Sequence, residues 1–346
     1  MTRYLVTGAQ GFTGRYVCAE ILRTQPQATV VGTGRSAQTF AAFTHEVTWK
    51  NGHVAAPLPA KLRFGDHDRY RYARCDLNDR SELDRLVART APDVVIHLAA
   101  ALRDDPNEVL IRSNVEGTAA LARAVARLER KPLVIFGSSG SVYGLPLSLP
   151  IAEEQRCAPD EPYAMSKLAA ELTARVLLRG TDVPLIVARI FNIVGPGQEE
   201  RHVCGRFAAQ AAAIARGDAP PTLTIGDLRP TRDFIDVRDV AHALVILSQH
   251  GVPGEAYNVA SGTESAIGDV LTLTLRAAGL EGKVSIAEQY SRAADVARAF
   301  ADIGKLRACG FEPEFSLDRM IADLLTYYLS DVAQAATSSA TTSATS

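Results

Sequence analysis

The sequence lacks most of the features that would place it in a membrane, in an oxidising compartment or on a nucleic acid. It has no apolar run long enough to span a bilayer. Its five cysteines are an odd number without C-x-x-C spacing, so we expect free thiols in a reducing cytoplasm rather than disulfides or a zinc site. The formal net charge is only −2, without a block of Lys or Arg, so neither a nucleic acid nor a membrane surface is an expected partner.

The composition that remains is typical of a folded chain. Of the 346 residues, 47% are hydrophobic and 22% are charged, which is close to the average of globular proteins. Short β-rich runs at residues 4–7, 30–33, 94–98 and 133–136 alternate with helical patterns at 13–23, 81–89 and 115–127. This alternation predicts βαβ units and a parallel sheet with helices on both faces. Because the first strand begins at residue 4, we expect no signal peptide.

The pattern divides the chain into a larger and a smaller part. Residues 1–185 are expected to form the sheet domain. After a further strand at 185–190 the segments are shorter and more mixed, so residues 186–330 are expected to form a smaller C-terminal lobe interleaved with the end of the sheet. Residues 44–72 interrupt the alternation and predict an insertion, either a surface hairpin or a lid. Residues 334–346 are almost entirely Ala, Ser and Thr, and we expect them to be disordered.

A glycine-rich turn follows the first predicted strand and opens the first predicted helix. Gly8, Gly11 and Gly14 form a G-x-x-G-x-x-G pattern. Glycine lets the backbone approach a pyrophosphate, and a helix N-terminus presents free N–H groups and a positive dipole end to it. An ordinary tight turn is the alternative, but the position after the first strand favours a doubly wound, dinucleotide-binding Rossmann fold.

The residues after the second predicted strand bear on the choice of dinucleotide. A site that prefers NAD usually has Asp or Glu there for the ribose hydroxyls, whereas this chain has Arg35 and Ser36. These residues favour the 2′-phosphate of NADP(H), with NAD(H) as the second candidate, and a merely solvated Arg35 is the alternative. Asp76 follows the third predicted strand, and we expect it either to bind the adenine or to be an ordinary turn residue.

Tyr163 and Lys167 form the only Y-x-x-x-K pair in the chain. On a helix this spacing puts both side chains on one face. The ammonium is expected to lower the phenol pKa from about 10, so that Tyr163 can exchange protons near neutral pH. Ser138 and Ser139 follow the strand at 133–136 and so lie at the carboxyl edge of the sheet, where ligands bind. Either hydroxyl could donate to a substrate carbonyl, and a Ser/Gly turn without chemistry is the alternative.

The glycine loop, the serine loop and the Tyr-Lys pair, in this order, resemble the extended short-chain dehydrogenase/reductase family that acts on nucleotide sugars. The resemblance extends over residues 1–329 apart from the insertion, and it includes the segments 97–100, 114–118, 189–192, 232–239 and 257–262. Within the family, the segment 191–198 is most similar to the GDP-4-keto-6-deoxy-D-mannose reductases. In the family the catalytic serine stands four residues before a Tyr-Gly tyrosine, here Tyr143, which selects Ser139.

This resemblance implies an NAD(P)-dependent oxidoreductase with Ser139, Tyr163 and Lys167 as its catalytic residues. The expected reaction is the reduction of a nucleotide-linked 4-keto-6-deoxy sugar in deoxysugar biosynthesis, by a cytoplasmic homodimer without a metal. One alternative is an NAD-dependent 4-epimerase with the same three residues, and another is a non-catalytic dinucleotide-binding protein. Gly140 and Ser141 stand where a 4,6-dehydratase has an acidic base, so dehydratase chemistry is excluded.

The motifs and the resemblance together imply two sets of binding residues. The residues expected to hold the cofactor are Gly8, Gln10, Gly11, Phe12, Thr13, Gly14, Arg35, Ser36, Asp76, Leu77, Leu98, Ala99, Ala100, Asn114, Tyr163, Lys167 and Ile190. The residues expected to hold the nucleotide sugar are Ser139, Ser141, Asn192, Val203, Phe207, Arg232, Arg292 and Asp295. Among the latter, Arg232 and Arg292 are expected to clamp the diphosphate.

Some other polar residues have plainer interpretations. His97 ends a strand in apolar surroundings, so we expect a core residue rather than a catalytic base. Asp233, Asp236 and Asp239 resemble a carboxylate cluster, but the arginines between them favour internal ion pairs over a metal site. The loop at residues 198–202 is expected to be a solvated border of the nucleotide site.

Overall fold

The structure is a computed structural model that describes residues 1–50, 52–288 and 296–335. Its centre is a seven-stranded sheet in the order β12-β8-β7-β6-β1-β2-β5, with every neighbouring pair parallel. The chain starts in the interior of the sheet and builds outward in both directions, which is the doubly wound arrangement that was predicted. The strands are β1 (Arg3–Thr7), β2 (Thr29–Gly34), β5 (Tyr70–Arg74), β6 (Val94–His97), β7 (Leu133–Ser139), β8 (Leu185–Ile190) and β12 (Ala256–Val259).

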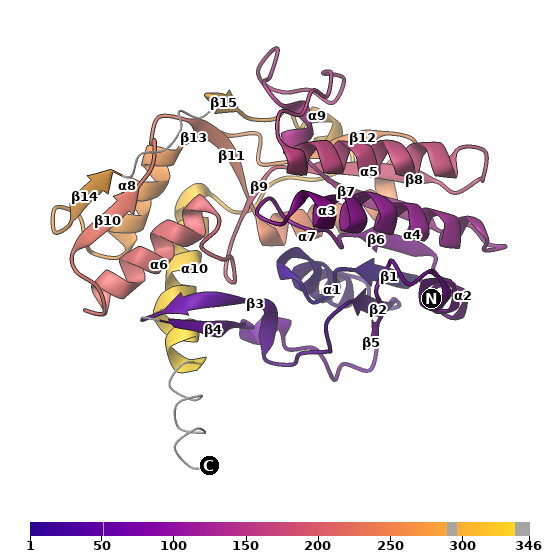
Figure 1. Ribbon diagram of the computed structural model, residues 1–346, viewed down its shortest axis with the longest axis horizontal. Coiled ribbons are helices and arrows are strands. Elements are labelled where there is room, and N and C mark those ends of the chain that lie inside the picture. The colour runs from indigo at the N-terminus through magenta and orange to yellow at the C-terminus, as the bar shows by residue number, and fades with distance from the viewer. Residues whose placement is uncertain (51, 289–295, 336–346) are drawn as a thin grey trace, which may run out of the picture.

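Helices cover both faces of this sheet (Figure 1). Residues of α1 (Phe12–Thr24) and α7 (Val237–His250) share one core, and residues of α2 (Arg80–Thr90), α4 (Gly117–Ala126) and α5 (Pro162–Leu178) share another. Because successive strand residues point to opposite faces, Ile135 of β7 lies in the first core and Phe136 in the second. Because side chains on both faces are buried, the strands are continuous apolar runs. Each buried side chain of this size contributes roughly 1.5–3 kcal/mol to the free energy of unfolding.

Short polar signals begin several helices. Asp79 caps α2 by accepting a hydrogen bond from the Glu82 backbone N–H at 3.0 Å, and Pro162 begins α5, where its missing N–H leaves no unsatisfied donor. The helix predicted at 115–127 corresponds to α4, and the structure has two further helical segments before it. The chain there forms α3 (Asn107–Leu110), a π-helical turn η2 (Ile111–Glu116) and then α4.

A smaller lobe lies at one end of the sheet, on the left of Figure 1. It contains the helices α6 (Val203–Ala215), α8 (Ile267–Ala277) and α10 (Leu317–Thr326), and the parallel pair β10 (Thr222–Ile225) and β14 (Ser285–Glu288). A second small sheet joins β9 (Asn192–Val194), β11 (Thr231–Asp236), β13 (Glu264–Ala266) and β15 (Arg298–Ala299). The short elements η3 (Gly140–Tyr143) and α9 (Gly304–Arg307) complete the chain near the sheet. The strand β12 and the helix α7 return to the large sheet from this half of the sequence.

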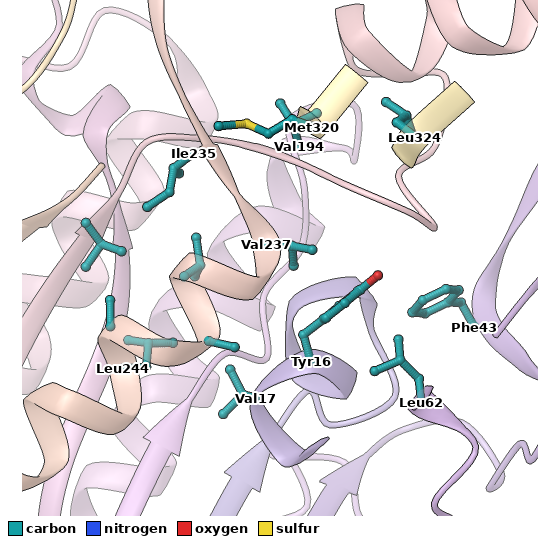
Figure 2. Packing of buried hydrophobic residues seen from close by; sticks show 14 of the residues in the cluster. Tyr16, Val17, Phe43, Leu62, Val194, Ile235, Val237, Leu244, Met320 and Leu324 are labelled. Atoms are coloured by element: carbon teal, nitrogen blue, oxygen red, sulfur yellow. The ribbon is translucent and has the colours of Figure 1, made fainter. Parts of the chain in front are cut away.

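Of the two structures predicted for the insertion at 44–72, a surface hairpin or a lid, the chain forms a hairpin, with different bounds and with one side packed in the core. It consists of β3 (Ala42–Trp49), β4 (Gly52–Pro57) and the short helix η1 (Ala60–Leu62), whereas Tyr70 and Tyr72 belong to β5 of the large sheet. One side of it is buried: Phe43 is 2% exposed and Leu62 is also 2% exposed. Figure 2 shows both side chains beside Tyr16 of α1, in the main core.

The C-terminal helix ties distant segments together. After α10 the chain continues through a π-helical turn, η4 (Tyr327–Asp331), and stays helical to residue 335, so Gln334 and Ala335 are ordered rather than disordered as predicted. Residues 336–346 of the predicted tail lie outside the described residues. Tyr327 donates a hydrogen bond to Pro57 O of the hairpin, and Tyr328 donates one to Gln198 O. Of the helices described, none combines the length and the apolar character needed to cross a membrane.

Candidate active site

A cavity of about 980 Å³ opens at the carboxyl ends of β1, β2, β6, β7 and β8. This is the edge where open α/β sheets bind ligands, because the loops that leave parallel strands meet there. Most of the predicted site residues lie in its wall. They are Gly8, Gln10, Gly11, Phe12, Thr13, Gly14, Arg35, Ser36, Asp76, Leu77, Leu98, Ala99, Ala100, Ser139, Ser141, Tyr163, Lys167, Ile190, Asn192, Val203 and Arg232.

Two predicted residues do not line the cavity, and two others lie outside the described residues. Phe207 is 2% exposed and packs in the main core on the inner side of α6, so it does not reach a ligand. Asn114 is buried behind the cavity wall. Arg292 and Asp295 lie outside the described residues, so the predicted clamp is represented by Arg232 alone.

The glycine loop has the geometry of a phosphate cradle. A Cβ on Gly14 would lie 2.1 Å from Gly8 O, and Gly8 itself has a positive φ of 70° with Ala99 N only 2.8 Å from its would-be Cβ. Only glycine fits this turn. No side chain caps the N-terminus of α1, so its first N–H groups face the cavity side without an internal partner. This combination suits a pyrophosphate.

A fully buried arginine holds the segment that follows β2. Arg15 donates to Gln10 Oε1 at 2.7 Å and to Thr39 O at 2.6 Å, and the Thr39 N–H donates to the same Gln10 oxygen. Gln10 Nε2 in turn donates to Ala37 O. Burial lowers the pKa of the Arg15 guanidinium, which has no carboxylate partner among the described residues. Gln10 thus lines the cavity, but its amide shapes the loop that carries Arg35.

Arg35, Ser36 and Asp76 lie at the end of the cavity next to β2 and β5. Their positions are compatible with contacts to a dinucleotide and equally with a solvated arginine and an ordinary turn aspartate. Arg35 and Ser36 are exposed and line the wall, and their carbonyls accept hydrogen bonds from Arg74 and Tyr72 of β5. Asp76 also lines the wall. Its Oδ1 accepts a hydrogen bond from the Asn78 N–H at 2.9 Å, as in an Asx turn.

Tyr163 and Lys167 extend from the first turns of α5 toward the end of β7. The Lys167 ammonium donates to Gly137 O at 2.5 Å and lies 4.8 Å from the centre of the Phe136 ring. Burial lowers the pKa of Lys167 to about 8, and Glu171, one turn further along α5, raises it in opposition. The lysine is therefore held rigidly at the wall with its proton poorly solvated.

Ser139 is the serine that meets the tyrosine. Its hydroxyl lies near enough to the Tyr163 phenol to lower the pKa of that phenol, and its Oγ lies 2.9 Å from Ser141 Oγ. Ser138 instead donates to Glu171 Oε2 at 3.3 Å, in a buried network with Arg189. The geometry therefore favours Ser139 over Ser138 as the group that faces a substrate carbonyl.

The pKa of Tyr163 differs from the sequence-based expectation. Burial raises it above its ordinary value, and the nearby Ser139 hydroxyl and the charge of Arg103 lower it in opposition. Because the Lys167 ammonium is directed toward Gly137 O and the Phe136 ring, it does not offset the burial. The phenol is consequently a proton donor rather than a phenolate in this arrangement.

Asn114 does not line the cavity and is hydrogen-bonded to α5, the helix that carries Tyr163 and Lys167. It lies in the π-helical turn η2 and is 2% exposed. Its Oδ1 accepts from Ala101 N at 2.7 Å and its Nδ2 donates to Ser166 Oγ at 2.9 Å. Ser166 then donates to Tyr163 O at 2.8 Å. Single π-helical turns are frequent at functional sites, because the extra residue re-aims a side chain.

His97 is a core residue, as its sequence context indicates. It is 3% exposed, with Nδ1 2.6 Å from Thr7 Oγ1 and Nε2 3.0 Å from Thr118 Oγ1. Burial, with the nearby charge of Lys167, lowers its pKa to about 3. The ring is neutral and fully engaged, so it joins the ends of β1 and β6 to α4 and does not serve as a base.

The three aspartates of the 233–239 segment have separate structural tasks. Asp233 accepts hydrogen bonds from Ser261 N and Gly262 N at 2.8 and 2.9 Å. Asp236 caps α7 and forms an ion pair with Arg238, while Asp239 accepts from backbone N–H groups at 314 and 315. Among the described residues, no group of three or more His, Cys, Asp or Glu side chains is arranged to hold a metal ion.

Charged residues gather in the cavity wall near the start of β11 and the start of α5. Arg232 of β11 is partly buried and donates to Thr231 O at 2.7 Å. Arg103 forms an ion pair with Glu161 at 2.5 Å, directly before the catalytic helix. Arg201 pairs with Glu199 at 2.8 Å. Burial and the charge of Arg103 both lower the pKa of Arg232, so the guanidinium groups of Arg103 and Arg232 are near enough to repel each other.

Sequence reasoning missed several of these wall residues. Arg103, Glu161, Thr44 and His45 carry no motif, and the loop at 198–202 was interpreted only as a solvated border. All of them line the cavity except Glu200 within that loop. The one signal available was the position of Glu161 two residues before Tyr163.

Comparison with known proteins identifies the family to which this chain belongs. The model of the NAD dependent epimerase/dehydratase family matches residues 4–260, which include the glycine loop, the serine loop and the Tyr-Lys pair. The chain belongs to this family. The expected extended short-chain dehydrogenase/reductase type is therefore confirmed, the chain is an enzyme of that type, and a non-catalytic dinucleotide-binding protein is no longer a useful interpretation.

Two relatives and one solved structure are similar to this chain over most of its length. It is 34% identical to the GDP-6-deoxy-D-mannose reductase of Pseudomonas aeruginosa over 250 residues, covering 70% of this chain and 82% of the reductase. The structure of RMD from the same organism, complexed with NADPH, has a TM-score of 0.78 at 29% identity and covers 96% of this chain and 100% of that one. The UDP-glucose 4-epimerase of Mycolicibacterium smegmatis is 27% identical, covering 94% of this chain and 98% of the epimerase.

Proposed function

We propose that this enzyme is an NADP(H)-dependent reductase of a nucleotide-linked 4-keto-6-deoxy sugar, with GDP as the nucleotide. One observation carries the proposal. A single cavity joins the glycine cradle to Ser139, Tyr163 and Lys167, and no carboxylate stands at Gly140 or Ser141. Hydride transfer to an existing ketone is the simplest use of such a site. The 34% identity to the GDP-6-deoxy-D-mannose reductase supports this choice of substrate.

The residues present fit a dinucleotide. The crowding at Gly8 and Gly14 leaves room for a phosphate and for no side chain, and α1 begins without a side-chain cap. Arg35, exposed at the end of β2, is the residue that supports NADP(H) over NAD(H). When bound, the nicotinamide supplies the hydride. The catalytic residues stabilise the negative charge that this transfer places on the carbonyl oxygen and supply the proton that neutralises it.

The chain's own residues can perform the remaining steps. Ser139 donates a hydrogen bond to the C4 carbonyl oxygen and polarises it. As negative charge develops on that oxygen, Tyr163 gives up its phenolic proton, since its raised pKa keeps it protonated until then. Lys167, held at the cavity wall by its hydrogen bond to Gly137 O, would bind the ribose hydroxyls of the cofactor. Arg232 binds the diphosphate and supplies binding energy remote from the reacting carbon.

A 4-epimerase that retains NAD is the second candidate, because a specific observation favours it. The UDP-glucose 4-epimerase of Mycolicibacterium smegmatis aligns with 94% of this chain, against 70% for the reductase. The UDP-glucuronic acid 4-epimerase from Bacillus cereus, solved with UDP-glucuronic acid and NAD, also has a TM-score of 0.77 at 25% identity. An epimerase recycles its cofactor, so it is expected to be purified with nicotinamide absorbance already present.

A homodimer is the assembly that we propose. Met165, Leu172 and Val176 of α5 are 52%, 53% and 64% exposed. The spacing i, i+7, i+11 puts them on one face of the helix. An apolar row of this kind on an otherwise polar surface suits burial against a second copy of the chain. The cytoplasmic location expected from the free thiols stays a prediction.

One assay decides between the two candidates. The purified protein is incubated with NADPH and GDP-4-keto-6-deoxy-mannose while the nicotinamide absorbance is followed. We expect stoichiometric NADPH oxidation and formation of a GDP-linked 6-deoxyhexose. Interconversion of the C4 epimers of a saturated nucleotide sugar, without net use of cofactor, would show that the enzyme is the epimerase instead.

A further inference from the structure

The hairpin contains an irregularity that directs two side chains into the cavity. Ala42 pairs with Pro57 and Glu46 pairs with Ala55, so three residues of β3 stand opposite a single residue of β4. Bulges of this type bend a strand and re-aim its side chains, often beside active sites. The bulged residues are Phe43, Thr44 and His45, and the last two line the cavity.

Phe43 packs the bulge against two segments of the cavity wall, the glycine loop and the loop before α6. Its ring lies edge-on to Phe12 of the glycine loop, with centroids 6.1 Å apart. A Cβ on Gly197 would lie 2.4 Å from the Phe43 ring, so the ring packs against bare backbone of the loop before α6. The imidazole of His45 stacks on Phe43 at 5.2 Å between centroids. His45 therefore stands between the phosphate cradle and the substrate side of the cavity.

The hydrogen bond of His45 determines which of its ring nitrogens carries a proton. Nε2 lies 2.8 Å from Gly197 O, and a carbonyl oxygen only accepts, so Nε2 is the donor. Burial lowers the pKa of His45 below its usual value, although Glu199 and the Gly197 carbonyl raise it in opposition. The ring is then neutral at pH 7, and Nδ1 is an acceptor. Nothing in the described part of the chain donates a hydrogen bond to Nδ1.

Contacts outside the cavity keep the hairpin rigid. The Thr48 N–H donates to Glu200 Oε1 at 2.7 Å, and the Arg216 guanidinium lies 4.4 Å from the Trp49 ring centre. Tyr327 bonds Pro57 O from the C-terminal helix. These contacts involve none of the residues that line the cavity. Because the hairpin is fixed from behind, the orientation of His45 is set before a ligand binds.

We propose that His45 determines ligand specificity by accepting, through Nδ1, a hydrogen bond from a hydroxyl group of the bound ligand. The inference rests on the proposed function, which fills the cavity with a dinucleotide and a nucleotide sugar. A neutral nitrogen with a lone pair selects a hydroxyl over a phosphate oxygen, since the latter has no proton to donate. Three sources offer such a hydroxyl: a ribose of the dinucleotide, the ribose of the nucleotide, and the hexose.

The experiment measures binding by calorimetry for three probes, NADPH, GDP and GDP-mannose. His45→Phe keeps a ring on Phe43 but removes both nitrogens. Glu200→Ala is the matched control for the contact between the hairpin and the loop at 198–202. It removes the acceptor of the Thr48 N–H without altering a cavity-lining residue. His53→Ala removes an exposed histidine from the other strand of the same hairpin. The three probes separate the three sources of hydroxyl.

We expect His45→Phe to weaken at least one probe by about three- to tenfold, as for the loss of one neutral hydrogen bond, while both control variants bind as the wild type does. An effect on NADPH assigns the dinucleotide ribose, an effect on GDP the nucleotide ribose, and an effect on GDP-mannose alone the hexose. The nitrogen NMR signal of Nδ1 should also move when the affected probe saturates the wild type, whereas a purely structural histidine keeps that signal in place.

Two outcomes overturn this assignment. If His45→Phe binds all three probes as tightly as the wild type, His45 makes no hydrogen bond to the ligand. If Glu200→Ala loses as much affinity as His45→Phe, the hairpin affects binding only by positioning the loop at 198–202. The proposed function fails separately: a protein that binds the probes in a manner sensitive to His45, yet oxidises no NADPH with the ketosugar, retains the His45 contact and loses the reductase. A wild type that binds none of the probes loses both.

Discussion

Tyr163 is the residue on which turnover should depend most. Tyr163→Phe removes the acidic proton and leaves the ring, so we expect kcat to fall by roughly 10²-fold or more, as for the loss of a general acid. NADPH affinity and melting temperature should stay close to those of the wild type. Tyr4→Phe is the matched control, since that hydroxyl bonds Ser248 far from the cavity wall. Turnover near the wild-type level in Tyr163→Phe would reject the assignment.

If Arg35 binds the 2′-phosphate, it determines the preference for NADPH over NADH. A charge-assisted hydrogen bond of this kind is worth about 1.5–3 kcal/mol, so Arg35→Ala should weaken NADPH by about tenfold or more and leave NADH almost unchanged. Arg71→Ala, an exposed arginine on β5 that does not line the cavity, serves as the control. Fluorescence titration with both cofactors measures the effect. Equal losses for NADPH and NADH would mean that Arg35 does not bind the 2′-phosphate.

Lys167 should leave a signature in the pH dependence of stability. Its pKa is lowered by burial to about 8 in the folded chain, against 10.5 as the ordinary value. Between these two pH values the unfolded chain binds more protons, so the free energy of unfolding of the wild type rises with pH, and the cost of burying the charge is complete below the folded pKa. At about 1.4 kcal/mol per pKa unit, the stability of Lys167→Met relative to the wild type should fall by about 2–3 kcal/mol across this window.

Urea unfolding of both proteins over a series of pH values measures the effect of Lys167→Met. The comparison between the two chains cancels the titration of every other group. Parallel stability curves would contradict the lowered pKa.

At the scale of elements, the loop that becomes η3 excludes one branch of the family's chemistry. A dehydratase needs a base to remove a proton from the sugar, and Gly140 and Ser141 cannot supply one. Incubation with GDP-mannose or dTDP-glucose and NAD is therefore expected to give no 4-keto-6-deoxy product, as followed by mass spectrometry of the nucleotide sugar. Accumulation of such a ketone would contradict both this exclusion and the reductase proposal.

The elements differ in how well the sequence predicts them. The helix predicted at 13–23 agrees with α1 to within one residue at each end, and the strand predicted at 185–190 has the bounds of β8. Periodicity alone was sufficient there, because both faces of the sheet are buried. In the insertion the sequence predicts a hairpin or a lid without the bounds of its strands, since the bulge at residues 43–45 interrupts the alternation that identifies a strand. Periodicity failed at η2, where one extra residue per turn leaves no compositional trace.

At the scale of the whole molecule, the exposed row on α5 should control assembly. Val176→Arg introduces a charge into the proposed interface, and we expect it to convert a dimer into a monomer in analytical ultracentrifugation. Val252→Arg is the matched control, because Val252 is 57% exposed and lies outside α5. A wild type that sediments as a monomer, or a Val176→Arg variant that remains a dimer, would contradict the proposed interface.

The site combines local motifs with contacts that only the folded chain creates. The glycine loop, Ser139 and the Tyr-Lys pair are short motifs, and their spacing alone predicts their chemistry. Thr44, His45 and Arg103 reach the same cavity from segments without a motif, and nothing in the sequence near them indicates a ligand. Asn114 and Phe207 show the opposite case, because a resemblance places them near the site without showing which way they point.

The two tyrosines of η4 connect the site to the order in which the ribosome makes the chain. Tyr327 bonds Pro57 across 270 positions of sequence, and Tyr328 bonds Gln198 across 130. A nascent chain has all seven strands of the large sheet once β12 is synthesised, yet the hairpin and the wall at Gln198 still lack these partners. The seven strands can therefore pair before α10 is synthesised, whereas the binding cavity gains the support of Tyr327 and Tyr328 only after η4 has emerged.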